Sequence, residues 1–522
     1  MKNRWLFVAV AGIFAAAAPL AGPGGGAAFA QSGHDLRSGR RVGDVDQVQI
    51  LLEVGGDHRW NVDGKIEKAP MSVVGEFRYL ERTLGLPGGA AELRRSARRY
   101  EKAAAVIKSK EVGLKPALRP ERSLLLVEAA PPTTTIYCPE GPLSREELDL
   151  VDILGNTLLY DALLPAETMA PEQRWKLPEP LVVALLGLDS AEQVDVESTL
   201  VEVDDALARF QLSGHVTGTR AGAVTRVELK GKYRLDRSRK RIDWLALLLR
   251  EDRQPGYIGP GLDVTVRLQV VIKPRVASEG LSESDVEGLP ARSDADLCRL
   301  VHESEGGDWR LLHDRRWYDV SMKGQDRSTL SLRMIDQDQF LAHCNVSLLP
   351  KRAAGKPVEL AEFQADVERA LGDRFGEFVE AGQSHSQADY RVYRVVALGK
   401  VDDRPVRWTY YLITDRDGRQ AALAFSVEGE QVERFGGQRV GGRFGGFGVV
   451  EQLLLADHID AQIGEHGEGC LRHLLGEFDV ERAPSEGEHA DTRPVGHGGT
   501  SGWSTRTVSG PRSSGTSPAR RG

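Results

Sequence analysis

The sequence predicts an α+β fold of two domains: an N-terminal curved antiparallel β-meander or half-barrel with helices, then a smaller α/β sandwich. Two observations lead to this prediction. Between residues 194 and 272, five long β-type runs follow one another with short polar turns between them, as in an antiparallel meander. Between residues 308 and 435, shorter strand patterns flank one long apolar stripe at helical spacing, so a helix should cover a sheet there.

The first thirty residues have the organisation of a bacterial-type export signal. Lys2 and Arg4 precede the apolar stretch Trp5–Leu20, which suits a signal-peptide core but is short for a spanning helix. Ala28-Phe29-Ala30 then supplies the small-x-small pattern that a signal peptidase reads. An uncleaved membrane anchor is the alternative, whereas the lack of a cysteine after the apolar stretch excludes a lipoprotein anchor. We expect residues 1–30 to be removed and the mature protein to be periplasmic or extracellular.

Composition limits the classes of function. The 522-residue chain has a formal charge of −8, which gives no electrostatic attraction to nucleic acid, so we expect no nucleic-acid partner. After the export signal, the longest apolar runs, such as Leu181–Leu186, have the size of core elements rather than membrane spans. We therefore expect a mature chain of two or more folded domains that does not span a membrane.

The four cysteines permit two disulfides in an oxidising compartment, but their spacing leaves the pairing open. They contain no Cys-x-x-Cys motif and are Cys138, Cys298, Cys344 and Cys470. Cys344 shares the apolar side of a strand pattern with Phe340, Ala342 and Val346, so we interpret it as a small buried hydrophobic residue.

The N-terminal domain is expected at residues 47–273, after a flexible polar arm at 31–46. Apolar residues at steps of four and three predict a first helix from Leu93 to Ile107. Ser144 followed by Glu147 is a capping-box pattern, which predicts a second helix running to Leu159.

A basic run lies on the polar side of the first predicted helix. It consists of Arg94, Arg95, Arg98 and Arg99. A solvated helix face is the default interpretation, and contact with a lipid headgroup or another anionic partner is the alternative.

Long strands fill the second half of this domain. They are expected at Val194–Val203, Ala206–Val216, Ala223–Leu235, Ile242–Glu251 and Asp263–Ile272. In outline this meander resembles the half-barrels of envelope lipid carriers. If the two short helices do not cover such a sheet, we expect it to fold further chain over itself, to dock the second domain, or to enclose an apolar ligand. An interior filled by side chains is the favoured outcome, because small barrels usually pack solid.

A linker is expected at 274–307, followed by the second domain at 308–435. There, paired strands are followed by a helix starting Leu360-Ala361-Glu362-Phe363 and by a meander containing Trp408-Thr409-Tyr410-Tyr411. This order of elements resembles the PsbP-like fold, named for extrinsic subunits of the photosynthetic oxygen-evolving complex. The resemblance covers roughly a quarter of the chain and implies an α/β sandwich that binds partners rather than catalyses. It carries over no binding residue.

One strand of the second domain has two different faces. Trp408, Tyr410 and Leu412 share one face, and we expect the helix to bury them. Tyr411 and Ile413 lie on the other face and are predicted to form a partly exposed contact surface.

The segment 436–522 is rich in Gly, Arg and Ser and is expected to be mostly disordered. Its Gly-Arg-Phe stretch at 436–448 is best interpreted as a tether, with RNA binding as the weaker alternative. His466, Cys470 and His473 are spaced by four and three, as a helical zinc or copper site would need, but no fourth ligand is defined.

No motif supports a specific reaction. The sequence lacks Gly-x-Ser-x-Gly and a phosphate-binding loop, and its nearest look-alike to a nucleophile elbow is Gly382-Gln383-Ser384-His385. The carboxylate pairs Asp336 with Asp338 and Asp415 with Asp417 fall at expected turns, where Asp is favoured for backbone hydrogen bonding alone. We therefore assign no catalytic, cofactor-binding or metal-binding residue and expect no cofactor.

These observations favour a non-enzymatic binding or scaffold protein of the bacterial cell envelope. Its partner would be another envelope protein or an apolar ligand. Two alternatives stay open: an envelope hydrolase whose site is scattered in sequence, and a carrier of a lipid-like ligand.

The first prediction concerns processing. Because Ala28-Phe29-Ala30 follows the apolar stretch, the mature chain should begin at Gln31. N-terminal sequencing of protein from an expressing bacterium checks this, and recovery of Met1 in membrane fractions would contradict it.

Overall fold

The computed structural model describes residues 33–455 except 63–64, 89–92, 111, 276–280, 305, 308, 322–328, 354–357, 386–389, 438, 441–442 and 445–452. The predicted export signal and the residues His466, Cys470 and His473 lie outside this part of the chain. Among the residues described, no helix is long and apolar enough to cross a membrane.

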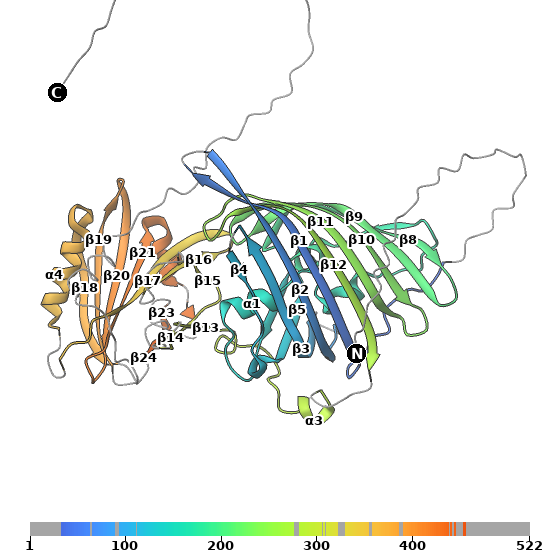
Figure 1. Cartoon of the computed structure of the whole chain (residues 1–522), viewed down its shortest axis with the longest axis horizontal. Helices are drawn as coiled ribbons and strands as arrows, with labels where there is room; N and C mark the ends of the chain where they lie inside the picture. The colour runs from blue at the N-terminus through green and yellow to red at the C-terminus, as the bar shows by residue number, and fades with distance from the viewer. Residues whose placement is uncertain are drawn as a thin grey trace, which may run out of the picture. The chain divides into compact units, whose positions relative to one another are not determined.

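Antiparallel β-structure dominates the described chain (Figure 1). The largest element is a sheet with strand order β6-β5-β3-β2-β1-β12-β11-β10-β9-β8-β7, with β4 paired to β3. Its strands are β1 (Val45–Val62), β2 (Lys65–Gly85), β3 (Arg94–Ser109), β4 (Val112–Leu114), β5 (Leu124–Ala130), β6 (Thr133–Tyr137), β7 (Arg174–Lys176), β8 (Ser190–Val203), β9 (Leu207–Arg220), β10 (Ala223–Asp236), β11 (Arg241–Arg253) and β12 (Gly261–Arg275).

The predicted meander corresponds to β8–β12. No local pattern in the sequence indicates the second pairing partner of β12. That partner is β1, which runs antiparallel to β12 from Val45 opposite Arg275 to Arg59 opposite Gly261. The pairing joins the two groups of strands β1–β6 and β7–β12 into one sheet. Period-two alternation decides which side chains are buried, as on β10, where alternate residues from Ala223 to Tyr233 face the core.

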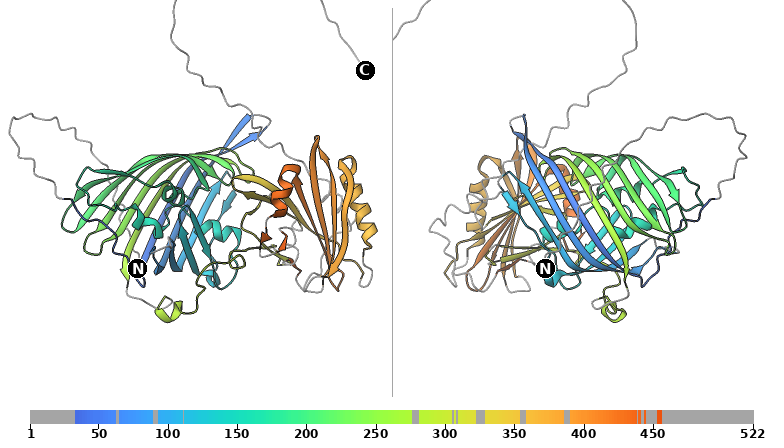
Figure 2. Two further views of the ribbon diagram at one scale, coloured as in Figure 1. Left: turned by 180° about the vertical axis from the view of Figure 1, so that it is seen from behind. Right: turned by 45° about the vertical axis from the view of Figure 1, so that its right-hand side comes forward.

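Short helices cover one face of this sheet (Figure 2). They are α1 (Arg145–Val151), the 3-10 helix η2 (Thr157–Leu163) and α2 (Glu179–Leu186). η2 contacts both β3 and β11, which belong to the two halves of the sheet. The residues that fill the space include Leu158, Leu159, Leu163, Leu181, Val182 and Leu185, each no more than 3% exposed. The sheet thus folds further chain over itself and side chains fill the space, in agreement with two of the expected outcomes.

The α+β prediction is wrong, because the described fold is β-rich and its helices are few and short. The helix expected from Leu93 to Ile107 is strand β3, paired on both sides with β2 and β5. Burial on both faces of β3 explains the error. Ala97 packs in the cluster on the face away from the helices, whereas Tyr100 packs in the main core, so apolar residues from two faces together give a spacing that imitates a helix.

The second predicted helix is confirmed at its start only. Ser144 accepts a hydrogen bond from the backbone N–H of Glu147, and the Glu147 carboxylate accepts one from the N–H of Ser144, which completes the capping box. α1 then ends at Val151, and the chain continues to Leu159 through a bend and η2 rather than as one helix.

The segments expected to be an arm and a linker both contact the sheet domain. Within the supposed flexible arm, Leu36 and Arg40 are buried. Residues 274–307 contain α3 (Glu283–Val286) and β13 (Leu300–Glu303), and Leu281 packs with Leu80 and other residues on the face of the sheet away from the helices.

A second sheet has the order β15-β16-β17-β21-β20-β19-β18, and β13, β14 and β24 form a third. These strands are β14 (Trp309–His313), β15 (Trp317–Asp319), β16 (Thr329–Asp336), β17 (Gln339–Leu349), β18 (Phe375–His385), β19 (Arg391–Val401), β20 (Arg404–Thr414), β21 (Gln420–Glu428) and β24 (Leu453–Leu455). Near the described C-terminal end lie η4 (Gly429–Gln431), α5 (Val432–Gly437), β22 (Arg439–Val440) and β23 (Arg443–Phe444). The helix α4 (Leu360–Leu371) is followed by Phe375 and Phe378 on β18, so the predicted apolar stripe is shared between a helix and a strand.

The prediction for the two faces of β20 is half confirmed. Trp408, Tyr410 and Leu412 are buried in a cluster with Phe363 of α4, as expected. Tyr411 and Ile413 do not form an exposed contact surface, because both are buried in a second cluster on the opposite face. Both faces of this sheet are covered in the middle. The resemblance to the PsbP-like fold stays a prediction.

The close approach of β1 and β12 leads to a prediction about Gly56. A Cβ atom there would lie 2.1 Å from the carbonyl oxygen of Asp263, whereas one at Gly55 would have no atom within 4 Å. Gly56→Ala should lower the free energy of unfolding by about 2 kcal/mol or more, because backbone must move. Gly55→Ala, the control on the same strand, should change it by less than about 0.5 kcal/mol. Urea unfolding of the two variants measures this difference, and equal stabilities would contradict the β1–β12 packing.

Candidate functional site

The residues singled out from the sequence do not come together in one site. Asp336 forms ion pairs with Arg316 (3.1 Å) and Arg434 (3.0 Å), and Asp338 lies in the turn between β16 and β17. Asp415 accepts hydrogen bonds from the backbone N–H groups of Asp417 and Arg419, as expected for a turn carboxylate.

The segment that resembles a nucleophile elbow does not have the backbone setting of one. Gly382-Gln383-Ser384-His385 lies on β18, at the edge of the second sheet, and not in a loop as expected. An edge strand without a following helix lacks the strained turn that exposes a catalytic serine.

Three of the four cysteines lie in the described chain, and all three are free thiols. Cys344 is buried as predicted, and burial raises the pKa of its thiol. Burial also raises the pKa of Cys138 and of Cys298. Nowhere in the described chain do three or more His, Cys, Asp or Glu residues form a group that could hold a metal ion.

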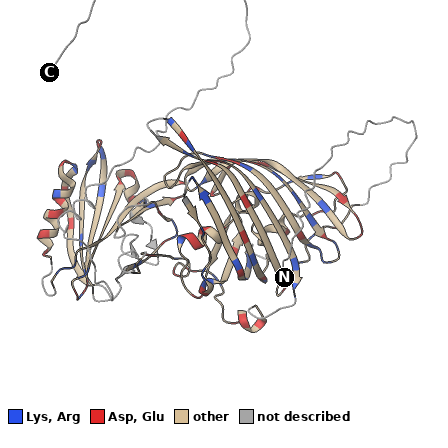
Figure 3. Ribbon diagram, viewed as in Figure 1, with Lys and Arg blue, Asp and Glu red and all other residues tan. Residues whose placement is uncertain are grey.

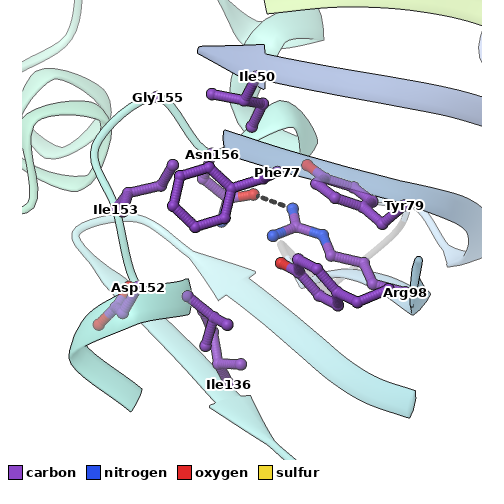
Figure 4. A pocket seen from close by; sticks show the side chains of 11 residues that line it. Ile50, Phe77, Tyr79, Arg98, Ile136, Asp152, Ile153, Gly155 and Asn156 are labelled. Carbon is purple, nitrogen blue, oxygen red and sulfur yellow. Dashed lines mark hydrogen bonds between the residues drawn. The ribbon is translucent and has the colours of Figure 1, made fainter. Parts of the chain in front are cut away.

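A buried ionic cluster, which the sequence did not predict, lies between the large sheet and η2. Its centre is Arg98, whose Nε donates to Oε1 of Glu81 (2.8 Å) and whose Nη2 donates to Oδ1 of Asn156 (2.5 Å). Figure 4 shows the guanidinium directed at Asn156 with the ring of Tyr79 beside it; the guanidinium carbon lies 5.1 Å from that ring's centroid. The basic run therefore belongs to a strand, and Arg98 is inside the protein rather than on a solvated helix face.

Arg40 extends this cluster from the N-terminal segment. Its Nε lies 2.7 Å from Oδ2 of Asp161, and its Nη1 lies 3.9 Å from Oε2 of Glu81. Burial alone would raise the pKa of Glu81, but the positive charges of Arg98 and Arg40 outweigh burial, so this pKa lies below its ordinary value. Glu81 is thus ionised at neutral pH, and the cluster is a set of compensated buried charges.

The cavity beside this cluster is too small for a substrate. Its volume is about 10 Å³, which corresponds to a single water molecule. Residues that line it include Tyr100, Asp152 and Asn156, and the Nδ2 group of Asn156 has no hydrogen-bond partner. The site can hold an ordered water and fix η2 against the sheet, but it offers no space for an organic ligand.

The opposite face of the large sheet carries a wider hollow, which we call the open-face hollow. Its volume is about 480 Å³, within the range of small-molecule sites. It is lined by Leu51, Glu53, Gln211, Lys230, Gly231, Lys232, Ala246, Leu247, Leu248, Arg267, Leu268 and Gln269. Figure 3 shows that basic and acidic residues are both distributed along the strands of the large sheet.

Strand register explains the composition of the open-face hollow. Lys232 lies opposite Ala246, which is opposite Gln269, which is opposite Leu51. In the next outward-facing row, Lys230 lies opposite Leu248, which is opposite Arg267. Side chains in such rows are neighbours, so Ala246 and Leu248 lie between the two lysines on one side and Gln269 and Arg267 on the other, with Leu51 beyond Gln269. We call Leu51, Ala246 and Leu248 the apolar floor of the hollow.

Leu51 and Leu248 are the exposed apolar residues of this floor, at 39% and 44% exposure. Apolar runs in the sequence indicate both residues. Ile50-Leu51-Leu52 and Leu245–Leu249 are uninterrupted apolar runs within strands that otherwise alternate. Such a run on a sheet with one covered face places apolar side chains on the uncovered face as well.

The buried cluster leads to a stability prediction. Arg98→Met should lower the free energy of unfolding by about 3–5 kcal/mol, because it leaves the carboxylate of Glu81 with less compensation in the interior. Arg78→Met is the control: Arg78 pairs with Glu101 at 4.0 Å on the surface, and its loss should cost less than about 1 kcal/mol. Chemical denaturation measures both, and an Arg98→Met protein as stable as the control would contradict the role given to the cluster.

Comparison with known proteins does not assign the chain to a family. No protein-family model and no curated protein matches the sequence. Among solved structures, lipovitellin aligns with 47% of this chain and 27% of its own length, at 10% identity and a TM-score of 0.27. The outer membrane protein OprD of Pseudomonas aeruginosa aligns with 74% of this chain and 93% of its own, at 8% identity and a TM-score of 0.11. The translocator domain of the autotransporter NalP of Neisseria meningitidis covers 75% and 90%, at 8% identity and a TM-score of 0.11. Likenesses this low identify neither the fold nor the function.

Proposed function

We propose that the chain is an exported, non-enzymatic binding protein of the bacterial cell envelope, and that it binds an apolar or amphiphilic ligand in the open-face hollow. The observation that carries this proposal is the apolar floor formed by Leu51 and Leu248 inside a hollow of about 480 Å³. Export is supported by the signal-type N-terminus alone.

The covered face of the sheet supports the same choice of site. There, the segment between β6 and β8 contributes side chains such as Leu159 and Leu185 that are almost fully buried. The cavity found on that side has room for about one water. An apolar ligand therefore has more space in the open-face hollow than in the cavity beside Arg98.

The strands that line the hollow form a rigid platform. Residues that line it come from β1, β11 and β12, which are continuous neighbours in the centre of the large sheet. Each strand is hydrogen-bonded on both sides, so the floor does not depend on a loop for its position. A preformed, rigid site binds with a smaller loss of conformational entropy.

Titration with Nile red, an uncharged solvatochromic dye, tests this proposal. The mature protein should give a saturable rise in fluorescence, and Leu248→Gln should weaken binding by about 1–2 kcal/mol because apolar contact is lost. Val224→Gln is the matched control, since Val224 is on the neighbouring strand β10, is 45% exposed and does not line the hollow.

The control should bind the dye as the unsubstituted protein does. If Leu248→Gln and Val224→Gln bind equally well, the dye is bound elsewhere and the open-face hollow is not the binding site. If neither protein nor variant gives a saturable signal, the binding role itself is wrong.

A further inference from the structure

The open-face hollow also indicates the charge of its ligand. We propose that it selects an anionic amphiphile, a single hydrocarbon chain ending in a carboxylate or phosphate group, with Lys230 and Lys232 binding the acidic group. This inference rests on the proposed function and goes beyond it by naming the ligand class and the residues that select it.

The first argument is the balance of charge at the hollow. Three cations line it, Lys230, Lys232 and Arg267, against one carboxylate, Glu53. Arg267 and Glu53 lie 4.0 Å apart and largely neutralise each other. Within the described chain, neither Lys230 nor Lys232 forms an ion pair, so two positive charges stay uncompensated at the rim.

The second argument concerns the acidic residues around the hollow. Glu76 lies opposite Leu51 on β2, and it forms an ion pair with Lys102 of β3. Glu228, two residues before Lys230 on the same face of β10, lies opposite Arg250 of β11. Both of these carboxylates therefore have basic neighbours of their own, and neither forms an ion pair with Lys230 or Lys232.

The third argument is the position of the charges relative to the floor. Lys230 lies directly opposite Leu248, and Lys232 directly opposite Ala246, across the β10–β11 pair. Directly opposed side chains in an antiparallel pair start about 4.5–5.5 Å apart at Cβ, and a lysine stem can lie along an apolar surface with its ammonium at the edge. A ligand whose hydrocarbon chain runs from Leu51 across β12 to Leu248 would thus place its terminal group beside two ammonium groups. Because the hollow combines an apolar surface with uncompensated positive charge, it favours an anionic amphiphile over a purely apolar molecule.

The experiment compares two probes on the full mature chain. One is dansyl-labelled undecanoic acid, and the other is its uncharged methyl amide, both below the concentration at which they aggregate. The acid should bind about tenfold more tightly than the amide at low salt, and the difference should shrink as salt screens the lysines. Lys230→Gln with Lys232→Gln should weaken binding of the acid about fivefold to tenfold and leave the amide unchanged.

Lys108→Gln with Lys273→Gln is the control pair. Both lysines are exposed on the open face, on β3 and β12, and neither lines the hollow. This variant keeps the net charge of the test variant and should bind both probes as the unsubstituted protein does. If the control variant loses as much affinity for the acid as the Lys230 and Lys232 variant does, the effect is one of overall charge, and the assignment of these two lysines is overturned.

The outcomes separate this inference from the proposed function. If acid and amide bind equally and both are lost in Leu248→Gln, the hollow binds apolar ligands and the selection for anions is wrong. If neither probe binds, both proposals fail. If the chain sediments with vesicles containing anionic phospholipid but binds neither dissolved probe, the face docks on a membrane surface and the single-ligand site is overturned.

Discussion

The antiparallel pairing of β1 with β12 is the contact on which the rest of the large sheet depends. It runs from Val45 opposite Arg275 to Arg59 opposite Gly261, between segments about 200 residues apart. Closing so long a loop costs chain entropy, but the cost grows only slowly with loop length. In return, two groups of strands become one sheet and share one hydrophobic face. The same closure places the segment between β6 and β8 against that face, where η2 contacts strands of both halves.

The buried ionic cluster shows how three distant parts of the chain are held in register. Arg40 comes from the N-terminal segment, Glu81 and Arg98 come from β2 and β3, and Asn156 precedes η2. Each charge is inside the protein and would be unfavourable without its partners. An arrangement in which η2 packed in another position would leave these groups without compensation. The cluster therefore favours one placement of the covering helices over other ways of burying the same leucines.

The two faces of the large sheet differ in what they can do. The covered face is filled by leucines and valines of the short helices, and its cavity near Arg98 has room for about one water. The open face keeps exposed leucines together with basic side chains in a hollow large enough for a small molecule. In the proposed function, recognition therefore belongs to the open face. A curved sheet that buries its own chain can still present a binding surface, provided that its outward-facing rows combine apolar and charged side chains.

The sequence by itself determined the elements whose signals are local. Period-two alternation located β8–β12, the Ser144 and Glu147 pattern located the start of α1, and the apolar stripe located α4 together with the face of β20 that it buries. Only the tertiary structure decided the pairing of β1 with β12, the burial of Arg98, and the covered second face that hides Tyr411. Pairing partners and burial depend on residues far away in the chain, and β3 buries apolar residues on both of its faces, so its apolar spacing imitates a helix. The open-face hollow is likewise decided by the tertiary structure, because its floor and its lysines come from separate strands and become neighbours only through their register.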